Sequence, residues 1–342
     1  MPESPRPERD AQIAAFAADA GWGAAERRSL AGDASNRRYL RLVRPDGARA
    51  VLMDAPASRG EDVRPFTAIA RHLSGLGLSA PAILAEDAEA GLLVLEDLGD
   101  ALFARVLERD PGQEETLYRA ATDLLVELHR HAPPAGLASY APAPMADLAA
   151  LALDWYGGGI TGRTDPELRA RLCALLARHL ADLPGIDEVL VQRDYHAENL
   201  LWLPERTGVA RVGLLDFQDA MRGHRAYDLV SLLEDARRDV SPAIADTMLA
   251  RYIAATGVDA AAFTTAFHWM GAQRNLRILG VFARLGLRDG KPHYLDLIPR
   301  VWTHLQTDLS HPALAPLAEM LDEALPPPGP AALARLRAGC AR

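Results

Sequence analysis

Apolar and polar positions alternate along the N-terminal part of the chain in the way that β-strands require. Residues 39–43 and 50–54 are short apolar runs separated by a Pro-Asp-Gly turn signal, and residues 27–30 before them indicate another strand. Residues 81–99 contain two further apolar runs with a turn between them. Short alternating runs bounded by glycine and proline are typical of strands. The pattern therefore predicts a sheet of five antiparallel strands.

Elsewhere, apolar residues recur every three or four positions, which predicts amphipathic helices. Residues 10–21 and 63–76 have this spacing, and after Gly99 it dominates. Residues 132–148 are rich in proline and alanine and residues 155–168 are rich in glycine, so we expect loops at both places. Further helices are expected at residues 101–131, 167–183, 222–256 and 260–288, with two more beyond residue 302.

The change of pattern at Gly99 divides the chain into a sheet with a packed helix and a mainly helical part. Within the helical part, residues 200–215 indicate two short strands joined by a turn. A chain of 342 residues is long for one hydrophobic core. We therefore expect an α+β protein of two lobes, residues 1–99 and residues 100–342.

Composition and charge narrow the class of protein. Hydrophobic residues make up 49% and charged residues 24%, which is typical of globular proteins, and the net charge of −9 argues against nucleic acid or an anionic membrane as a partner. Cys173 and Cys340 are the only cysteines, and neither has metal-ligand or disulfide-framework spacing. Residues 1–10 are polar, and no apolar run approaches membrane-spanning length. We expect a cytoplasmic monomer that acts on a small molecule.

The strongest chemical signal lies in residues 191–219, where acid and amide side chains flank the predicted hairpin. Asp194 precedes Asn199 by five positions, and Asp216 follows the second apolar run. In kinases, one Asp orients the attacking hydroxyl, and an Asn and a later Asp hold magnesium. Following a small sheet, this order predicts a protein-kinase-like fold with a catalytic hairpin.

Several segments resemble the aminoglycoside phosphotransferase and choline kinase group of small-molecule kinases. They are QRDYHAENLLW, LLDFQDA and GHRAYDLVSL, together with GDASNRRYLRL and LEDLGD nearer the N-terminus. The resemblance implies ATP as phosphoryl donor and Mg²⁺ as cofactor. It also implies that Asp194 is the catalytic base, that Asn199 and Asp216 are metal ligands, and that Asp228 supports the catalytic loop from below.

The segment 268–302, HWMGAQRNLRILGVFARLGLRDGKPHYLDLIPRVW, resembles bacterial anomeric kinases for N-acetylmuramate and N-acetylglucosamine. These kinases act in peptidoglycan recycling, so the resemblance implies a sugar kinase acting on an anomeric hydroxyl. An aminoglycoside- or choline-type kinase is the first alternative. A nucleotide-binding pseudokinase is the second.

The pseudokinase alternative arises from a missing lysine. Protein kinases place a phosphate-binding Lys on the third strand, where this chain has Met53 or Asp54. Lys291 is the only lysine in the chain, so arginines near the sheet must supply the charge. The candidates are Arg37, Arg38, Arg49 and Arg59, and the partner role of Glu61 or Asp62 becomes doubtful.

The predicted nucleotide site has two parts, a turn between strands and backbone groups at the connection between the lobes. Taken alone, the sequence of the turn is also typical of an ordinary hairpin. Its members are Gly32, Asp33, Ala34, Ser35, Asn36 and Arg37 in the turn, and Glu96, Asp97 and Leu98 in the connection.

The predicted acceptor site consists of polar residues near the catalytic loop and in one long helix. His196 could touch substrate or brace the loop, and the helix residues 273–275 could bind substrate or form a buried network between helices. Trp155 and the glycines after it could form a lid or a plain loop. The candidate substrate residues are His196, Glu198, Gln218, Asp219, Arg222, Arg274 and Asn275.

Overall fold

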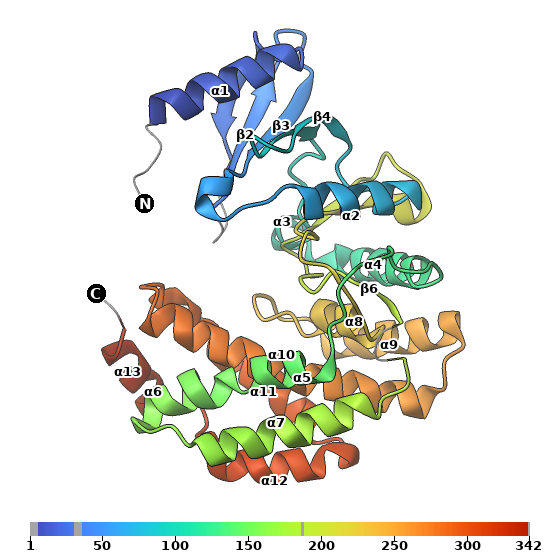
Figure 1. Ribbon diagram of the computed structural model, residues 1–342. Helices are drawn as coiled ribbons and strands as arrows, with labels where there is room; N and C mark the ends of the chain where they lie inside the picture. The colour runs from blue at the N-terminus through green and yellow to red at the C-terminus, as the bar shows by residue number, and fades with distance from the viewer. Residues whose placement is uncertain (1–5, 31–35, 186–187, 341–342) are drawn as a thin grey trace. The chain divides into compact units, whose positions relative to one another are not determined.

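The structure, a computed structural model, describes residues 6–30, 36–185 and 188–340 (Figure 1). Gly32, Asp33, Ala34 and Ser35 of the predicted nucleotide turn lie outside the described residues.

The chain folds into two compact units that are interleaved in sequence. The sheet unit comprises residues 1–109 and 198–219, and the helical unit comprises residues 110–197 and 220–342. The sheet unit thus extends past Gly99 and also contains the predicted hairpin. The division into domains 1–99 and 100–342 stays a prediction.

The sheet unit contains the predicted five-stranded antiparallel sheet, with strand order β1-β2-β3-β5-β4. The order places β3 between β2 and β5, and the apolar residues of β3 and β5 are the most buried of the sheet. The strands are β1 (Glu26–Ser29), β2 (Arg38–Val43), β3 (Arg49–Asp54), β4 (Ile83–Asp87) and β5 (Leu92–Glu96).

One face of this sheet is covered by the N-terminal helix α1 (Arg6–Asp19) (Figure 1). Ile13 and Ala17 of the helix pack with Leu42 and Leu52 of the strands in one buried apolar cluster. Because side chains alternate between the faces of a strand, every second residue of β3 joins this cluster and the others point to the opposite face.

The predicted hairpin also belongs to the sheet unit and is tied to it by backbone hydrogen bonds. The Leu214 amide donates to the Ser79 carbonyl over 2.9 Å, and the Trp202 amide donates to the Ala101 carbonyl over 2.8 Å. Strands β7 and β8 pair in antiparallel register. The remaining elements of the unit are η1 (Ala57–Arg59), α2 (Arg64–Gly75), α3 (Phe103–Arg109), β7 (Leu200–Trp202), η4 (Gly208–Arg211) and β8 (Val212–Leu214).

The helical unit is built around the long helix α10, which is buried over most of its length and packs against α11, α8 and α5. Among the described residues, no helix is both long enough and apolar enough to cross a membrane. The elements are η2 (Pro111–Gln113), α4 (Glu114–Leu128), α5 (Pro142–Ala149), η3 (Ala152–Gly157), α6 (Gly158–Thr161), α7 (Pro166–Ala181), β6 (Val189–Val191), β9 (Met221–Gly223), α8 (Ala226–Leu233), α9 (Pro242–Thr256), α10 (Ala260–Leu287), η5 (Pro292–Leu297), α11 (Ile298–Leu309), η6 (Pro312–Leu314), α12 (Ala315–Ala324) and α13 (Pro330–Ala338).

The helical prediction for residues 222–256 is wrong at its start, because this segment begins in a strand; two helices follow. Its first residues belong to β9, which pairs with β6 in front of the catalytic loop. A break between Leu233 and Pro242 then separates α8 from α9. The residues before the break are buried, whereas Pro242 and Ala243, which begin α9, are exposed.

The loop predicted at residues 155–168 is also wrong over its first half. Residues 152–157 form one π-helical segment that continues into α6. Glycine occurs here because neighbours approach closely: a Cβ at Gly159 would lie 2.7 Å from Leu336 Cδ2 and 2.8 Å from Leu287 Cδ1. The loop predicted at residues 132–148 likewise ends early, in α5, whose first helical residue is the tolerated Pro142.

Candidate active site

The loop that carries Asp194 leaves β6 and is held from below by a buried carboxylate. Asp228, in the first turn of α8 and fully buried, accepts backbone N–H bonds from Gln192 over 2.6 Å and Arg193 over 2.9 Å. Arg193 has a left-handed φ of 74°, which turns the chain just before Asp194. Burial raises the pKa of Asp228 to about 7, while the two backbone bonds oppose this shift. The predicted supporting role of Asp228 is confirmed by these bonds.

Asp194 itself is half-buried, and the residues on both sides of it are anchored to helices. The Tyr195 hydroxyl donates to the Ala121 carbonyl of α4 over 2.9 Å. On the other side, the Ser231 hydroxyl donates to the Arg193 carbonyl over 3.3 Å. These bonds fix the backbone at Asp194, which is what a side chain that positions a reacting group requires.

His196 follows in the same loop and is 4% exposed. Its Nε2 lies 3.4 Å from Nη1 of Arg237, and burial lowers the pKa of the imidazole to about 4. Of the two alternatives for His196, a neutral, buried ring beside Arg237 supports bracing of the loop.

Asn199 and Asp216 flank the β7–β8 hairpin in the sheet unit. The Leu215 amide donates to the Asn199 carbonyl over 3.0 Å, and this pairing brings the two side chains together. Asn199 Nδ2 lies 3.4 Å from Asp216 Oδ2, and Asp216 has a left-handed φ of 57°. One amide and one carboxylate are hard oxygen donors that suit Mg²⁺, which takes the rest of its ligands from water and phosphate. The donor set therefore fits the implied metal.

Two neighbours hold Asp216 in place. Gln218 Nε2 donates to Asp216 Oδ1 over 2.7 Å. Phe217, fully buried, stacks on Phe66 of α2 with ring centroids 4.9 Å apart. This stack was not predicted, although the phenylalanine between two polar residues in the run LLDFQD was a signal for it.

Of the predicted connection residues, Glu96 is the last residue of β5, and Asp97 and Leu98 follow that strand. The Glu96 amide donates to the Ala82 carbonyl over 2.8 Å, which continues the pairing of β4 and β5 to its end. Asp97 Oδ1 accepts from the Gly99 amide over 2.9 Å, and Arg41 Nε lies 2.7 Å from Asp97 Oδ2. These contacts shape the turn that follows the sheet.

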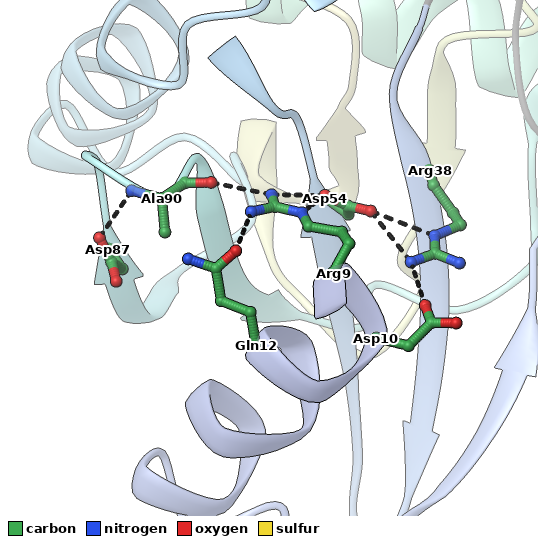
Figure 2. A network of polar contacts seen from close by, with 7 residues as sticks. All are labelled: Arg9, Asp10, Gln12, Arg38, Asp54, Asp87 and Ala90. Atoms are coloured by element: carbon green, nitrogen blue, oxygen red, sulfur yellow. Dashed lines mark hydrogen bonds and ion pairs between the residues drawn. The ribbon is translucent and has the colours of Figure 1, made fainter. Parts of the chain in front are cut away.

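Asp54, one of two residues at the expected lysine position, belongs to a network on the α1 side of the sheet. Figure 2 shows its carboxylate between Arg9 and Arg38, with Nη2 of Arg9 at 2.6 Å and Nη2 of Arg38 at 3.1 Å. Arg9 also donates to the Ala90 carbonyl over 2.8 Å. Met53 points to the opposite face and is 1% exposed.

On that opposite face, Arg37 pairs with Glu61, the residue whose role as an acidic partner was in doubt. Arg37 Nε donates to Glu61 Oε2 over 2.7 Å, and each side chain is 12% exposed. Asn36 joins them through its amide, which donates to Glu61 Oε1 over 3.2 Å, and through Nδ2, which donates to the Arg59 carbonyl.

The helix residues 273–275 are part of a buried network between helices. Arg274, 3% exposed, donates to the Ser231 hydroxyl over 2.9 Å and to the Glu234 carbonyl. Asn275 Nδ2 donates to Glu234 Oε2 over 2.7 Å and to Asp308 Oδ2 over 3.0 Å. Of the two alternatives for these residues, the contacts support the structural one.

The other acceptor candidates are divided between the two units. Glu198 is half-buried in the sheet unit, where Gln218 also lies, next to the exposed Asp219. Arg222, in β9 of the helical unit, is half-buried, and its Nε donates to the Leu137 carbonyl over 3.1 Å. Arg222 thus lies beside the segment that leads into α5.

These elements define the class of the protein. A five-stranded antiparallel sheet, a loop with Asp194 and Asn199 held by a buried carboxylate, and a hairpin that ends at Asp216 make a protein-kinase-like phosphotransferase. A family model, the phosphotransferase enzyme family, matches residues 26–264, and the chain belongs to this family.

Named relatives agree with this class. The N-acetylmuramate/N-acetylglucosamine kinase of Caulobacter vibrioides is 41% identical over 355 residues, which cover 93% of this chain and 97% of that protein. A choline/ethanolamine kinase family protein from Mesorhizobium loti has the same fold, with a TM-score of 0.59, 15% identity and coverage of 97% and 99%. An amicoumacin kinase in complex with AMP-PNP and Ca²⁺ has a TM-score of 0.58, 17% identity and coverage of 84% and 89%.

Proposed function

We propose that the protein transfers the γ-phosphoryl group of ATP to the anomeric hydroxyl of N-acetylmuramate, N-acetylglucosamine or both, in peptidoglycan recycling. The observation that carries the proposal is the 41% identity to a kinase of that name over nearly the full length of both chains. Because the match covers 93% of this chain, it includes the helical unit as well as the sheet unit, which supports a shared acceptor.

Asp194 is the proposed catalytic residue. Its carboxylate would accept the proton of the acceptor hydroxyl and orient that oxygen for in-line attack on phosphorus. The bonds from Gln192 and Arg193 to Asp228 support this role, because they fix the backbone from which Asp194 projects.

Asn199 and Asp216 are the proposed Mg²⁺ ligands. When bound, the metal would supply charge neutralisation on the transferred phosphate. The residues themselves contribute a rigid pair of oxygen donors, since Gln218 and the stack of Phe217 on Phe66 hold Asp216 in its left-handed conformation.

ATP would bind to the sheet unit. We propose that the backbone of Glu96, Asp97 and Leu98 contacts adenine, and that the turn at residues 32–36 contacts the phosphates through its N–H groups. The amicoumacin kinase shares the fold of this chain and contains AMP-PNP, but the position of that nucleotide is a property of the amicoumacin kinase alone.

We propose that the acceptor sugar contacts those residues of the predicted acceptor site that are half-buried or exposed. His196, Arg274 and Asn275 would support these contacts from the interior, in view of their burial. The proposed contact residues are Glu198, Gln218, Asp219 and Arg222.

The test is a panel of acceptors offered to the purified protein with ATP and Mg²⁺. N-acetylmuramate, N-acetylglucosamine, an aminoglycoside and choline are compared by coupled ADP release, and phosphorus NMR identifies the product. We expect turnover of the amino sugars and an anomeric phosphate. Turnover of the aminoglycoside or choline alone would overturn the substrate, a primary phosphate would overturn the anomeric position, and ATP binding with no turnover at all would indicate a pseudokinase.

A further inference from the structure

The sheet of this kinase carries no lysine, yet the phosphates of ATP require a positive charge that protein kinases take from a strand lysine paired with a glutamate of the following helix. The face of the sheet on which each nearby arginine lies decides which of them can supply that charge. In β3, Ala50 and Leu52 belong to the cluster under α1, so Met53 lies on the opposite face. Tyr39 of β2 is the Cα partner of Met53 and shares that face.

Three of the four candidate arginines are placed elsewhere. Arg38 lies on the α1 face and bonds to Asp54 and Asp10. Arg49 begins β3 at the end opposite Met53, where its Cα partner is Val43. Arg59 ends a 3₁₀ turn outside the sheet; its carbonyl accepts from Asn36 Nδ2, but the residue is exposed.

Arg37 has the required placement. It directly precedes β2 and is two residues from Tyr39, so it lies on the face of Met53 and Tyr39. Its ion pair with Glu61 is 12% exposed on both sides, whereas the Arg28–Glu26 pair of β1 is 61% exposed on both sides. A pair that is largely withdrawn from solvent has a defined geometry, which most surface pairs lack.

Asp216, the proposed metal ligand, lies near the same group. Burial raises the pKa of the Tyr39 hydroxyl; Arg37 lowers it by charge and by a hydrogen bond, and the charge of Asp216 raises it further. Arg37, Glu61, Tyr39 and Asp216 all belong to the sheet unit.

We propose that Arg37, oriented by Glu61, binds the phosphates of ATP in place of the missing strand lysine. The inference rests on the proposed function for the identity of the nucleotide. Glu61 holds the guanidinium through Nε, as a glutamate orients the lysine in protein kinases, and a guanidinium is suited to bidentate phosphate binding. The positive charge thus enters from the beginning of β2 and not from the end of β3.

The test measures nucleotide binding without an acceptor, by calorimetry with ATP, ADP and adenosine in the presence of Mg²⁺. Arg37→Met is expected to weaken ATP binding at least tenfold and to leave adenosine binding within twofold, because only the phosphates lose a contact. Arg28→Met, which removes an arginine from the exposed ion pair of the same sheet, is the matched control and should bind ATP like the wild type. Thermal unfolding of each variant checks that it is folded.

If Arg37→Met fails to fold, a second variant moves the positive charge from residue 37 to residue 53. In Arg37→Met/Met53→Lys, the new lysine lies on the same face beside Tyr39 and should recover at least threefold of the lost ATP affinity. Arg37→Met/Glu61→Gln removes the unpaired carboxylate and should fold but bind ATP as weakly as Arg37→Met.

The outcomes separate the two proposals. Unchanged ATP affinity in Arg37→Met, or an equal loss for adenosine and ATP, would overturn the role of Arg37. If the wild type binds ATP in an Arg37-dependent manner but phosphorylates no amino sugar, the proposed substrate fails and the role of Arg37 stands.

Discussion

Asp and Asn side chains occur in two polar regions of this chain that differ in burial. Asp194, Asn199 and Asp216, around the catalytic loop and hairpin, are half-buried. Asn275 and Asp308, in the network around α10, are fully buried. In the first set, backbone bonds position Asp194 and Asn199, and Gln218 holds Asp216; the second set is linked side chain to side chain within the interior.

The buried network around α10 shows how burial changes the pKa of acidic side chains. Burial raises the pKa of both Glu234 and Asp308, and the charge of Asp308 raises the pKa of Glu234 further. Asn275 Nδ2 donates to both acids, and His268 Nδ1 lies 3.0 Å from Asp308 Oδ1. Side chains committed in this way stabilise packing and are poorly placed to bind a substrate. Residues suited to chemistry are therefore those whose backbone is fixed while the side chain remains partly accessible.

The largest expected effect comes from Asp194→Asn. The variant keeps the shape of the loop and removes the base, so kcat/KM should fall about 10³-fold, within the range for general bases. Its melting temperature should stay within about 2 °C of the wild type, because the loop is held by Asp228 and not by Asp194. Steady-state kinetics and thermal unfolding measure the two quantities.

Asp246→Asn, an exposed acid of α9, is the control and should change neither quantity. Undiminished turnover by Asp194→Asn would show that another residue is the base. A large fall in melting temperature would show that Asp194 belongs to the structural region.

The buried network gives the second effect, on stability. Asn275→Leu removes the amide that donates to both Glu234 and Asp308, which leaves two buried acids without that donor. We expect the free energy of unfolding to fall by about 3 kcal/mol, as when a buried polar pair is broken. Urea unfolding followed by fluorescence measures the change.

Gln306→Leu replaces an exposed amide on α11, the helix that also carries Asp308, and should change the free energy of unfolding by less than about 0.5 kcal/mol. If both variants lost the same stability, the network would have no special role. If folded Asn275→Leu retains the kcat of the wild type, the role of Asn275 is structural.

The sequence predicted the fold where local pattern and tertiary packing agree. Strands β2, β3 and β5 are short apolar runs that contribute to the cluster under α1, and α7 has an uninterrupted helical spacing. The local pattern gave a wrong prediction where contacts with distant parts of the chain determine the structure. Residue 159, within α6, is glycine because Leu336 and Leu287 approach it closely, and nothing within residues 155–168 indicates that contact.

The candidate site divides in the same way. The spacing of Asp194, Asn199 and Asp216 was readable because one loop and one hairpin carry all three. The partners of Asp54 and Arg37 were not readable, since they depend on which face of the sheet each residue occupies. Likewise, the run 273–275 appeared as a polar cluster in the sequence, and only the packing of α10 against α8 and α11 assigned it to the interior.

The smallest effect concerns the choice of acceptor. It compares the half-buried Arg222 with the buried Arg274. N-acetylmuramate has a lactyl carboxylate that N-acetylglucosamine lacks. Arg222 is half-buried and Arg274 is 3% exposed, so only Arg222 is suited to contact an acceptor anion. Arg222→Ala should raise KM for N-acetylmuramate about tenfold, or about 1.4 kcal/mol, and leave KM for N-acetylglucosamine nearly unchanged.

Arg274→Ala is the matched variant. Loss of its bonds to Ser231 and the Glu234 carbonyl should lower stability and reduce turnover of both sugars to the same extent, because the Arg193 carbonyl loses its indirect support. Kinetics with both sugars, at a temperature where both variants are folded, decide the matter. Equal losses for the two sugars in Arg222→Ala would remove the carboxylate role from Arg222, and a selective loss in Arg274→Ala would show that a buried arginine reaches the acceptor after all.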